Sequence, residues 1–145
     1  MITSQNSFKR IILAVDGSIS SMNAAKKSII LSKKLDTPLL SIYVVEKKRF
    51  LKFTSSTDYN IWKRETEEEA QKILNRIEEL ASEENVDVNT MLLHGTPSEE
   101  IIKQVNKNDL IVMGGKGHSS LDRILLGSVS ETVIHHADST VMIVK

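Results

Sequence analysis

The sequence contains no cysteine, two prolines and six glycines in 145 residues, and aromatic side chains make up only 4% of it. The absence of cysteine excludes a disulfide scaffold, thiolate metal sites and cysteine nucleophiles. Nineteen basic and nineteen acidic side chains cancel, so no net field draws the chain to nucleic acid or to an anionic membrane. This length and composition are typical of one globular domain, which we expect to span residues 1–145.

Long apolar runs are also missing. No stretch of the sequence is apolar over the length that a bilayer requires. The polar residues 1–6 lack the apolar middle of a secretory signal. We therefore expect a cytoplasmic protein with neither a membrane nor nucleic acid as its partner.

Apolar residues alternate between strand-like and helix-like spacing along the chain, without a linker or an internal repeat. Short apolar runs predict strands at residues 11–15, 39–45, 86–93, 110–113 and 140–144. Helical spacing predicts a helix carrying Ala25, Ile29 and Leu35, a second over residues 58–84, a third beginning near Thr96, and a fourth from Gly127 or Ser128 to about His136. Strands joined by helices imply a parallel sheet with right-handed crossovers and helices on both faces, a three-layer α/β sandwich.

Two of the predicted helices carry start signals. Thr96, Pro97 and Glu99 supply an N-cap, a first-turn proline and a capping-box glutamate. Ser128 is followed three residues later by Glu131, which is again the spacing of a capping box. The last helix is therefore expected to begin at Gly127 or Ser128.

A glycine-rich stretch directly follows the predicted strand at residues 110–113. Gly114, Gly115 and Gly117 stand there, and glycine lets a backbone turn sharply and approach a ligand closely. The next helix would direct its first amide groups and its dipole at an anion. Ligands of parallel α/β sheets bind outside the carboxyl ends of the strands. The stretch thus predicts a phosphate site.

The spacing of Gly114, Gly117 and the pair Gly127-Ser128 resembles the nucleotide-binding signature of the universal stress protein family. Nearly the whole chain is covered: residues 10–18 resemble the family's first strand and acidic turn, and residues 125–144 resemble its closing helix and strand. The resemblance implies one adenine nucleotide alpha-hydrolase-like domain with strand order 3-2-1-4-5 and four helices. It also implies a cytoplasmic dimer that binds ATP or AMP and responds to stress.

The resemblance further implies which residues form the site. The expected nucleotide-binding residues are Ala14, Asp16, Val44, Met113, Gly114, Lys116, Gly117, His118, Gly127, Ser128 and Val129. Gly114 and Gly117 would expose amides to the phosphates, and Gly127 and Ser128 would close the cradle. Asp16 would contact the ribose or a Mg²⁺ ion carried by the nucleotide. The backbone of Val44 would contact adenine, with Ala14 beside the base, while Lys116 and His118 would lie on the phosphate tail.

Simpler explanations of these residues stay open. The glycines can merely shape a tight loop, Ser128 can merely cap its helix, and Asp16 begins an ordinary Asp-Gly-Ser turn. Lys116 and His118 can be solvated loop side chains. Residues 46–53 are basic with interleaved aromatics, which fits a lid, a partner contact, a nucleic-acid patch or a solvated loop.

Three functions are compatible with these patterns: a nucleotide-binding stress or signalling module, a weak ATP hydrolase, and a dimeric interaction protein that binds no nucleotide. The intact glycine spacing favours the first over the third. No compelling general base lies near the predicted phosphates, so we do not expect efficient catalysis. The sequence has no P-loop motif, and His94, His135 and His136 lack the spacing of metal ligands.

The end of the chain predicts an assembly. Residues 141–144 are all apolar, and in the implied strand order the last strand, Thr140–Val144, lies at a sheet edge. An exposed apolar edge is an aggregation hazard unless it is covered. The family's usual solution is to pair these strands across a two-fold axis. We therefore expect a homodimer formed through this strand.

Overall fold

The computed structural model describes residues 7–47, 55–116 and 126–145. Strands and helices alternate along these ranges. The strands are β1 (Arg10–Val15), β2 (Leu39–Glu46), β3 (Val88–Gly95), β4 (Asp109–Gly114) and β5 (Thr140–Val144). The helices are α1 (Ile19–Leu35), α2 (Ser56–Glu83), α3 (Pro97–Gln104) and α4 (Ser128–His136). This is the alternation that the apolar spacing predicts.

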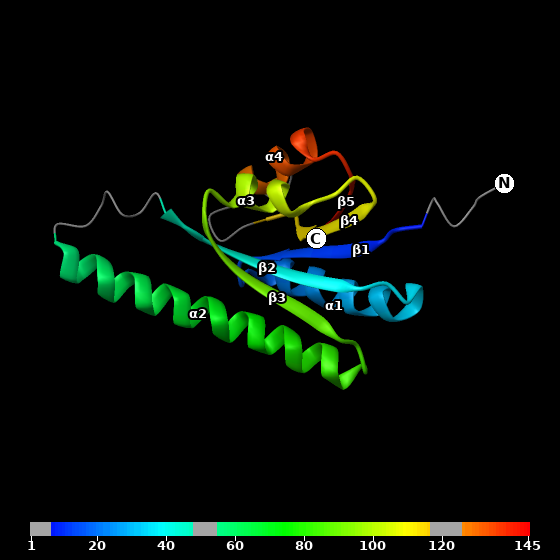
Figure 1. Cartoon of the computed structure of the whole chain (residues 1–145), viewed down its shortest axis with the longest axis horizontal. Helices are drawn as coiled ribbons and strands as arrows, with labels where there is room; N and C mark the ends of the chain where they lie inside the picture. Colours follow the sequence, from blue (N-terminus) through cyan, green and yellow to red (C-terminus); the bar gives the residue numbers. More distant parts are fainter. Residues whose placement is uncertain (1–6, 48–54, 117–125) are drawn as a thin grey trace.

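The five strands form one parallel sheet in the order β3-β2-β1-β4-β5. Helices α1 and α2 cover one face of the sheet, and α3 and α4 cover the other (Figure 1). The expected three-layer fold and strand order are confirmed. The chain leaves β1 toward the face of α1 and leaves β4 toward the face of α4, so the winding reverses between these neighbouring strands. A crevice forms at such a reversal, outside the carboxyl ends of the strands.

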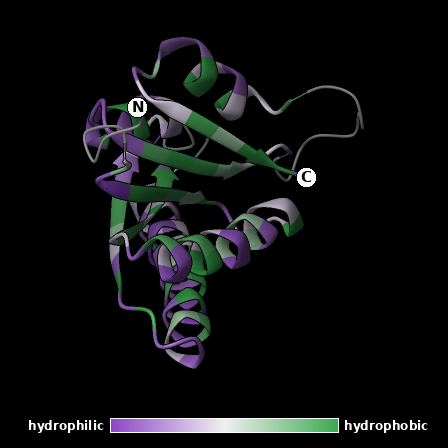
Figure 2. Cartoon of the chain, turned by 90° about the vertical axis from the view of Figure 1, so that its right-hand side faces the viewer, coloured by the Kyte–Doolittle hydropathy of each residue, from purple (hydrophilic) through white to green (hydrophobic). Residues whose placement is uncertain are grey.

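Alternate residues of the strands serve two separate cores. Ile11 and Leu13 of β1 are fully buried against α1 and α2, where Leu74 also packs. Ile12 and Ala14, which point the other way, belong to the clusters under α3 and α4. Burying one such aliphatic side chain contributes about 1.5–3 kcal/mol. Figure 2 shows the result, since the strands are predominantly hydrophobic and the helices carry alternating hydrophobic and hydrophilic bands.

Only the C-terminal half of helix α2 packs buried side chains against the sheet. Its buried residues are Ala70, Leu74, Ile77 and Ala81, which lie on one stripe because they are spaced by three or four. None of residues 56–69 is buried. The N-terminal half of α2 runs instead beside the carboxyl ends of β2 and β3 (Figure 1). No helix in the described ranges is both long and apolar enough to cross a membrane.

Strand β3 begins two residues later than its apolar residues predict. Asn85 adopts a left-handed conformation with φ 57°, and the amide of Val86 donates to the carbonyl of Ala81 at 2.9 Å. These are features of a helix that ends in a Schellman motif. Val86 therefore closes α2, and the strand starts only at Val88.

The capping box predicted for the last helix is wrong, although the helix has the expected bounds. Gly127, and not Ser128, is the N-cap of α4. Glycine has no side chain with which to bond the first amides, and α4 has no side-chain cap hydrogen bond. Thr96 is the N-cap of α3 as predicted, but its hydroxyl does not bond the helix either. Both helices begin at the crevice.

Candidate functional site

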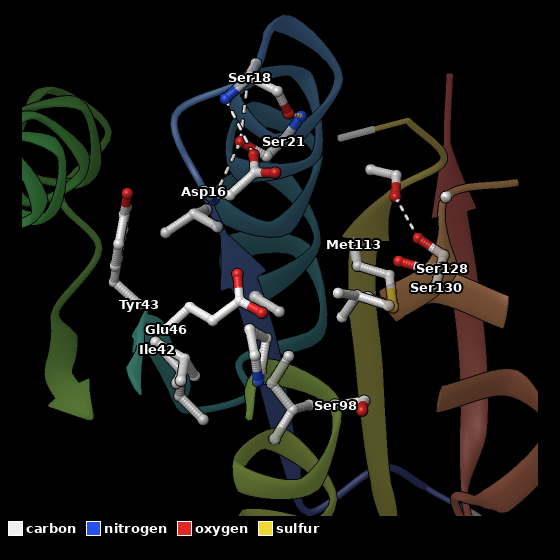
Figure 3. Close-up of a pocket in the computed structure, with 18 of the residues that line it drawn as sticks. Asp16, Ser18, Ser21, Ile42, Tyr43, Glu46, Ser98, Met113, Ser128 and Ser130 are labelled. Atoms are coloured by element: carbon white, nitrogen blue, oxygen red, sulfur yellow. Dashed lines mark hydrogen bonds between the residues drawn. The ribbon is translucent and has the colours of Figure 1, made fainter. Parts of the chain in front are cut away.

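A cavity of about 610 Å³ lies over the carboxyl ends of β1, β2 and β4 (Figure 3). Residues from the beginnings of α1, α3 and α4 and from the N-terminal half of α2 complete its wall. The cavity is therefore at the reversal of the winding. Its volume is in the range typical of small-molecule sites, roughly 300–1,000 Å³.

Most of the residues predicted to bind a nucleotide line this cavity. They are Ala14, Asp16, Val44, Met113, Gly114, Lys116, Gly127, Ser128 and Val129. Gly117 and His118 lie outside the described residues, as does most of the basic segment 46–53. The structure thus brings together side chains from both halves of the sequence, because parallel strands end at the same edge of the sheet.

The turn after β1 is organised by Asp16. Its Oδ1 atom accepts a hydrogen bond from the amide of Ser18 at 2.9 Å, and Gly17 between them has φ 83°. This is an Asx turn, in which the side chain replaces a backbone acceptor. Ser18 then caps α1, since its Oγ accepts from the amide of Ser21 at 3.3 Å. The same Asp16 carboxylate borders the cavity (Figure 3), so its role in the turn is compatible with a contact to a ligand.

Hydrogen bonds join the glycine-rich stretch that follows β4, here called the glycine loop, to the first turn of α1. They are made by Ser18, the N-cap of α1, and by Ser20. The hydroxyls of Ser20 and Ser18 donate to the carbonyl of Lys116 at 2.6 and 3.2 Å. The amide of Lys116 donates in turn to Ser20 Oγ at 3.3 Å. Both serines are buried. The turn after β1 and the start of the glycine loop therefore form one connected wall of the cavity.

Gly114 is needed where β4 passes close to α1. A Cβ atom at residue 114 would lie 2.7 Å from the backbone carbon of Ser20 and 2.7 Å from the amide nitrogen of Ser21. Backbone atoms cannot move aside as the end of a side chain can. The carbonyl of Gly114 also accepts a hydrogen bond from Ser130 Oγ at 2.8 Å. Close packing thus explains this glycine, in addition to the phosphate contact that the resemblance implies.

The N-terminus of α4 is held at the cavity by backbone hydrogen bonds. The amide of Gly127 donates to the carbonyl of Gly115 at 2.8 Å, and the amide of Gly115 donates to the carbonyl of Val144 at 3.0 Å. Ser128 and Val129, the first residues of α4, line the cavity together with Lys116. A helix N-terminus without a side-chain cap, next to a lysine, is a favourable environment for an anion.

Apart from Val44, the wall of the cavity formed by β2 and α2 contains no residue that the sequence predicts as nucleotide-binding. Tyr43 and Glu46 of β2 and Trp62 and Thr66 of α2 also line the cavity. Glu46 ends β2, so the rule that sites form at the carboxyl ends of strands could have identified it. Trp62 and Thr66 carry no such local signal, because only the position of α2 against the sheet brings them to the cavity.

The carboxylates of the cavity suit a metal ion only in combination with a ligand. Mg²⁺ is usually held by one or two carboxylates together with substrate phosphates and water. Asp16, which lines the cavity, supplies one such carboxylate. Across residues 7–47, 55–116 and 126–145, no group of three or more His, Cys, Asp or Glu side chains is placed to hold a metal by itself. The residues present therefore fit Mg²⁺ that arrives with a nucleotide.

Known proteins are similar to this chain in sequence and in architecture. A family model described as the universal stress protein family matches residues 7–145. A universal stress protein of Methanocaldococcus jannaschii is 38% identical over 143 residues, which are 97% of this chain and 84% of the relative. The match spans all the described elements.

Solved structures with the same fold include UspA from Lactobacillus plantarum, with a TM-score of 0.82, 20% identity, and coverage of 96% of this chain and 99% of that chain. Another is a universal stress protein from Archaeoglobus fulgidus in complex with dAMP, with a TM-score of 0.64, 19% identity, and coverage of 95% and 98%. At these identities the likeness shows the fold alone. The family match and the identity to the Methanocaldococcus protein show more: this chain belongs to the universal stress protein family.

Proposed function

We propose that this protein binds an adenine nucleotide, ATP or AMP, in the cavity over β1, β2 and β4 and acts as a nucleotide-dependent stress or signalling module. The main support is the N-terminus of α4, which lacks a side-chain cap and borders the cavity beside Lys116. Phosphate groups are stabilised at such a helix end. The dAMP complex of the Archaeoglobus relative supports the same class of ligand.

In the proposed complex, the phosphates lie at Gly127 and Ser128, and the base lies near Ala14, Val44 and Met113. Asp16, between these ends of the cavity, contacts the ribose or a Mg²⁺ ion bound to the phosphates. Mg²⁺ neutralises phosphate charge when it is bound. Gly117 and His118 belong to the proposed site through the family resemblance.

We expect binding with slow or no hydrolysis. Ser128, Ser130 and Thr132 are the hydroxyl side chains that line the cavity at α4. A hydroxyl is a poor general base, and catalysis of this kind requires a base within hydrogen-bond reach of the attacking water. A change in a loop or in a subunit interface when nucleotide binds then carries the signal.

We also propose a cytoplasmic homodimer formed through β5. This strand ends the sheet order next to β4, and Met142 on it is 36% exposed. Leu126 and Ile134 are exposed at 40% and 39%. A second copy related by a two-fold axis would pair the two edges and cover these side chains.

Native mass spectrometry of the freshly purified protein, combined with a fluorescence titration, tests nucleotide binding. Trp62 is the only tryptophan and lines the cavity, so its emission is expected to change when a nucleotide binds. We expect retained ATP or AMP as added mass, or a saturable change of emission. If neither occurs at millimolar nucleotide, the proposal is wrong and an interaction protein without a nucleotide is favoured. A single-turnover assay with ATP separates binding from hydrolysis.

A further inference from the structure

The two ends of the cavity differ in charge. At β4 and α4 the helix N-terminus and Lys116 favour an anion. At β2 the half-buried side chain of Glu46 directs its carboxylate into the cavity (Figure 3). Within the described ranges this carboxylate forms no hydrogen bond and no ion pair. A carboxylate in this position, only partly hydrated, is an acceptor that a ligand can satisfy.

The sheet order keeps Glu46 away from the proposed phosphates. Strand β1 lies between β2 and β4, so two interstrand spacings, about 10 Å, separate the strand of Glu46 from the strand that leads to the glycine loop. Phosphates beside a carboxylate would be repelled. A nucleotide whose phosphates lie at α4 therefore reaches the end of β2 with its base.

Glu46 also has the right neighbours for a base. It follows Val44 by two residues on the same strand, so both side chains point to the same face of the sheet. Val44 packs with the cluster that contains Ala14 and Met113, which is where we place the base. Trp62 lines the adjoining wall, and an aromatic face packs well against a flat ring.

We propose that Glu46 selects the base of the ligand by accepting a hydrogen bond from its exocyclic amino group. Adenine presents its 6-amino group as a donor. A base without that group leaves the carboxylate unpaired in the cavity, and a site built around a polar contact rejects such an analogue strongly. This inference rests on the proposed function and adds a residue that determines its specificity.

The test compares AMP with purine riboside 5′-monophosphate, which differs from AMP only by lacking the amino group. Fluorescence or calorimetric titration gives the ratio of the two dissociation constants for the wild type, Glu46→Ala and Glu46→Gln. We expect the wild type to bind AMP roughly 10-fold or more tightly, as is typical of hydrogen bonds to a charged group. Glu46→Ala should bind both ligands equally, and Glu46→Gln, whose amide oxygen still accepts, should retain a few-fold preference.

The ratio is the decisive quantity, because removing a negative charge strengthens the binding of any anion. Glu69→Ala is the control: this residue is exposed on α2, and its loss should leave the ratio unchanged. A wild-type ratio near one, or an undiminished preference in Glu46→Ala, overturns the inference while AMP binding still supports the proposed function. A wild-type protein that binds neither ligand overturns both. Melting curves of all three variants confirm that they are folded.

Discussion

The Nε2 atom of His94 on β3 lies 2.7 Å from Oε1 of Glu67 on α2. The two side chains are 32% and 34% exposed. Glu67 follows Thr66 directly and lies little more than one turn after Trp62, and both of these residues line the cavity. The pair thus links the sheet to the half of α2 that has no buried residue. We infer that it holds the α2 wall of the cavity in place.

Replacing His94 or Glu67 with alanine is expected to lower the free energy of unfolding by about 0.5–1 kcal/mol, because partial exposure weakens the contact. Urea denaturation of the two variants and of the double mutant measures their coupling. The emission of Trp62 should shift to the red as the wall loosens. Glu78→Ala is a matched control, since it removes an exposed 3.0 Å hydrogen bond to Thr90 between the same helix and strand. A coupling energy near zero contradicts the expectation.

Gly127→Asp should separate the stability of α4 from its binding of phosphate. Gly127 has φ −64° and ψ 157°, which an L-residue adopts freely, and aspartate is a favourable N-cap. We expect the protein without nucleotide to be at least as stable as the wild type. The affinity for ATP or AMP should fall by roughly 100-fold or more. The new carboxylate would lie beside the phosphates, and two like charges about 4 Å apart cost ~4 kcal/mol near a protein surface.

Titration of the Trp62 fluorescence measures the effect of Gly127→Asp. Ser55→Asp is the control, because Ser55 is the N-cap of α2 and does not line the cavity. Undiminished binding in Gly127→Asp would mean that the phosphates lie elsewhere.

Gly114→Ala is expected to destabilise the fold by about 1–3 kcal/mol, the usual cost of overpacking a close contact. The added methyl group would meet the backbone of Ser20 and Ser21. Gly115→Ala should cost less, because its nearest obstacle is Cγ2 of Ile143 at 3.1 Å, the end of a side chain that can shift. Urea denaturation compares the two variants. Equal losses would contradict the packing explanation of Gly114.

Met142→Lys should disrupt the proposed homodimer, since a charge placed in an apolar interface would be desolvated there. Light scattering or sedimentation should report a monomer, or the variant should be insoluble. Ile61→Lys provides the control, because Ile61 is 44% exposed on α2, the helix that packs against β2 and β3 on the other side of β1 from β5. A wild-type protein that is monomeric at high micromolar concentration contradicts the dimer without bearing on the nucleotide site.

The sequence by itself determined where the secondary structure elements lie. The apolar run at residues 110–113, for example, predicts a buried strand, and these residues form the centre of β4 (Asp109–Gly114). Periodicity and helix-start signals act over a few residues, which is why such elements can be located without the fold. The family resemblance added the strand order, and the carboxyl-end rule then explains why Asp16 and Gly114 meet at one crevice.

Tertiary structure decided the features that depend on how distant elements pack. Strand β3 begins later than its apolar residues predict, because the amide of Val86 donates to the carbonyl of Ala81 and so closes α2. Gly114 is required because α1 passes close to β4. Trp62 reaches the cavity only because the other half of α2 is anchored to the sheet. Such contacts join residues that are far apart in sequence, and their geometry is set by the burial of the whole core, so no local pattern could reveal them.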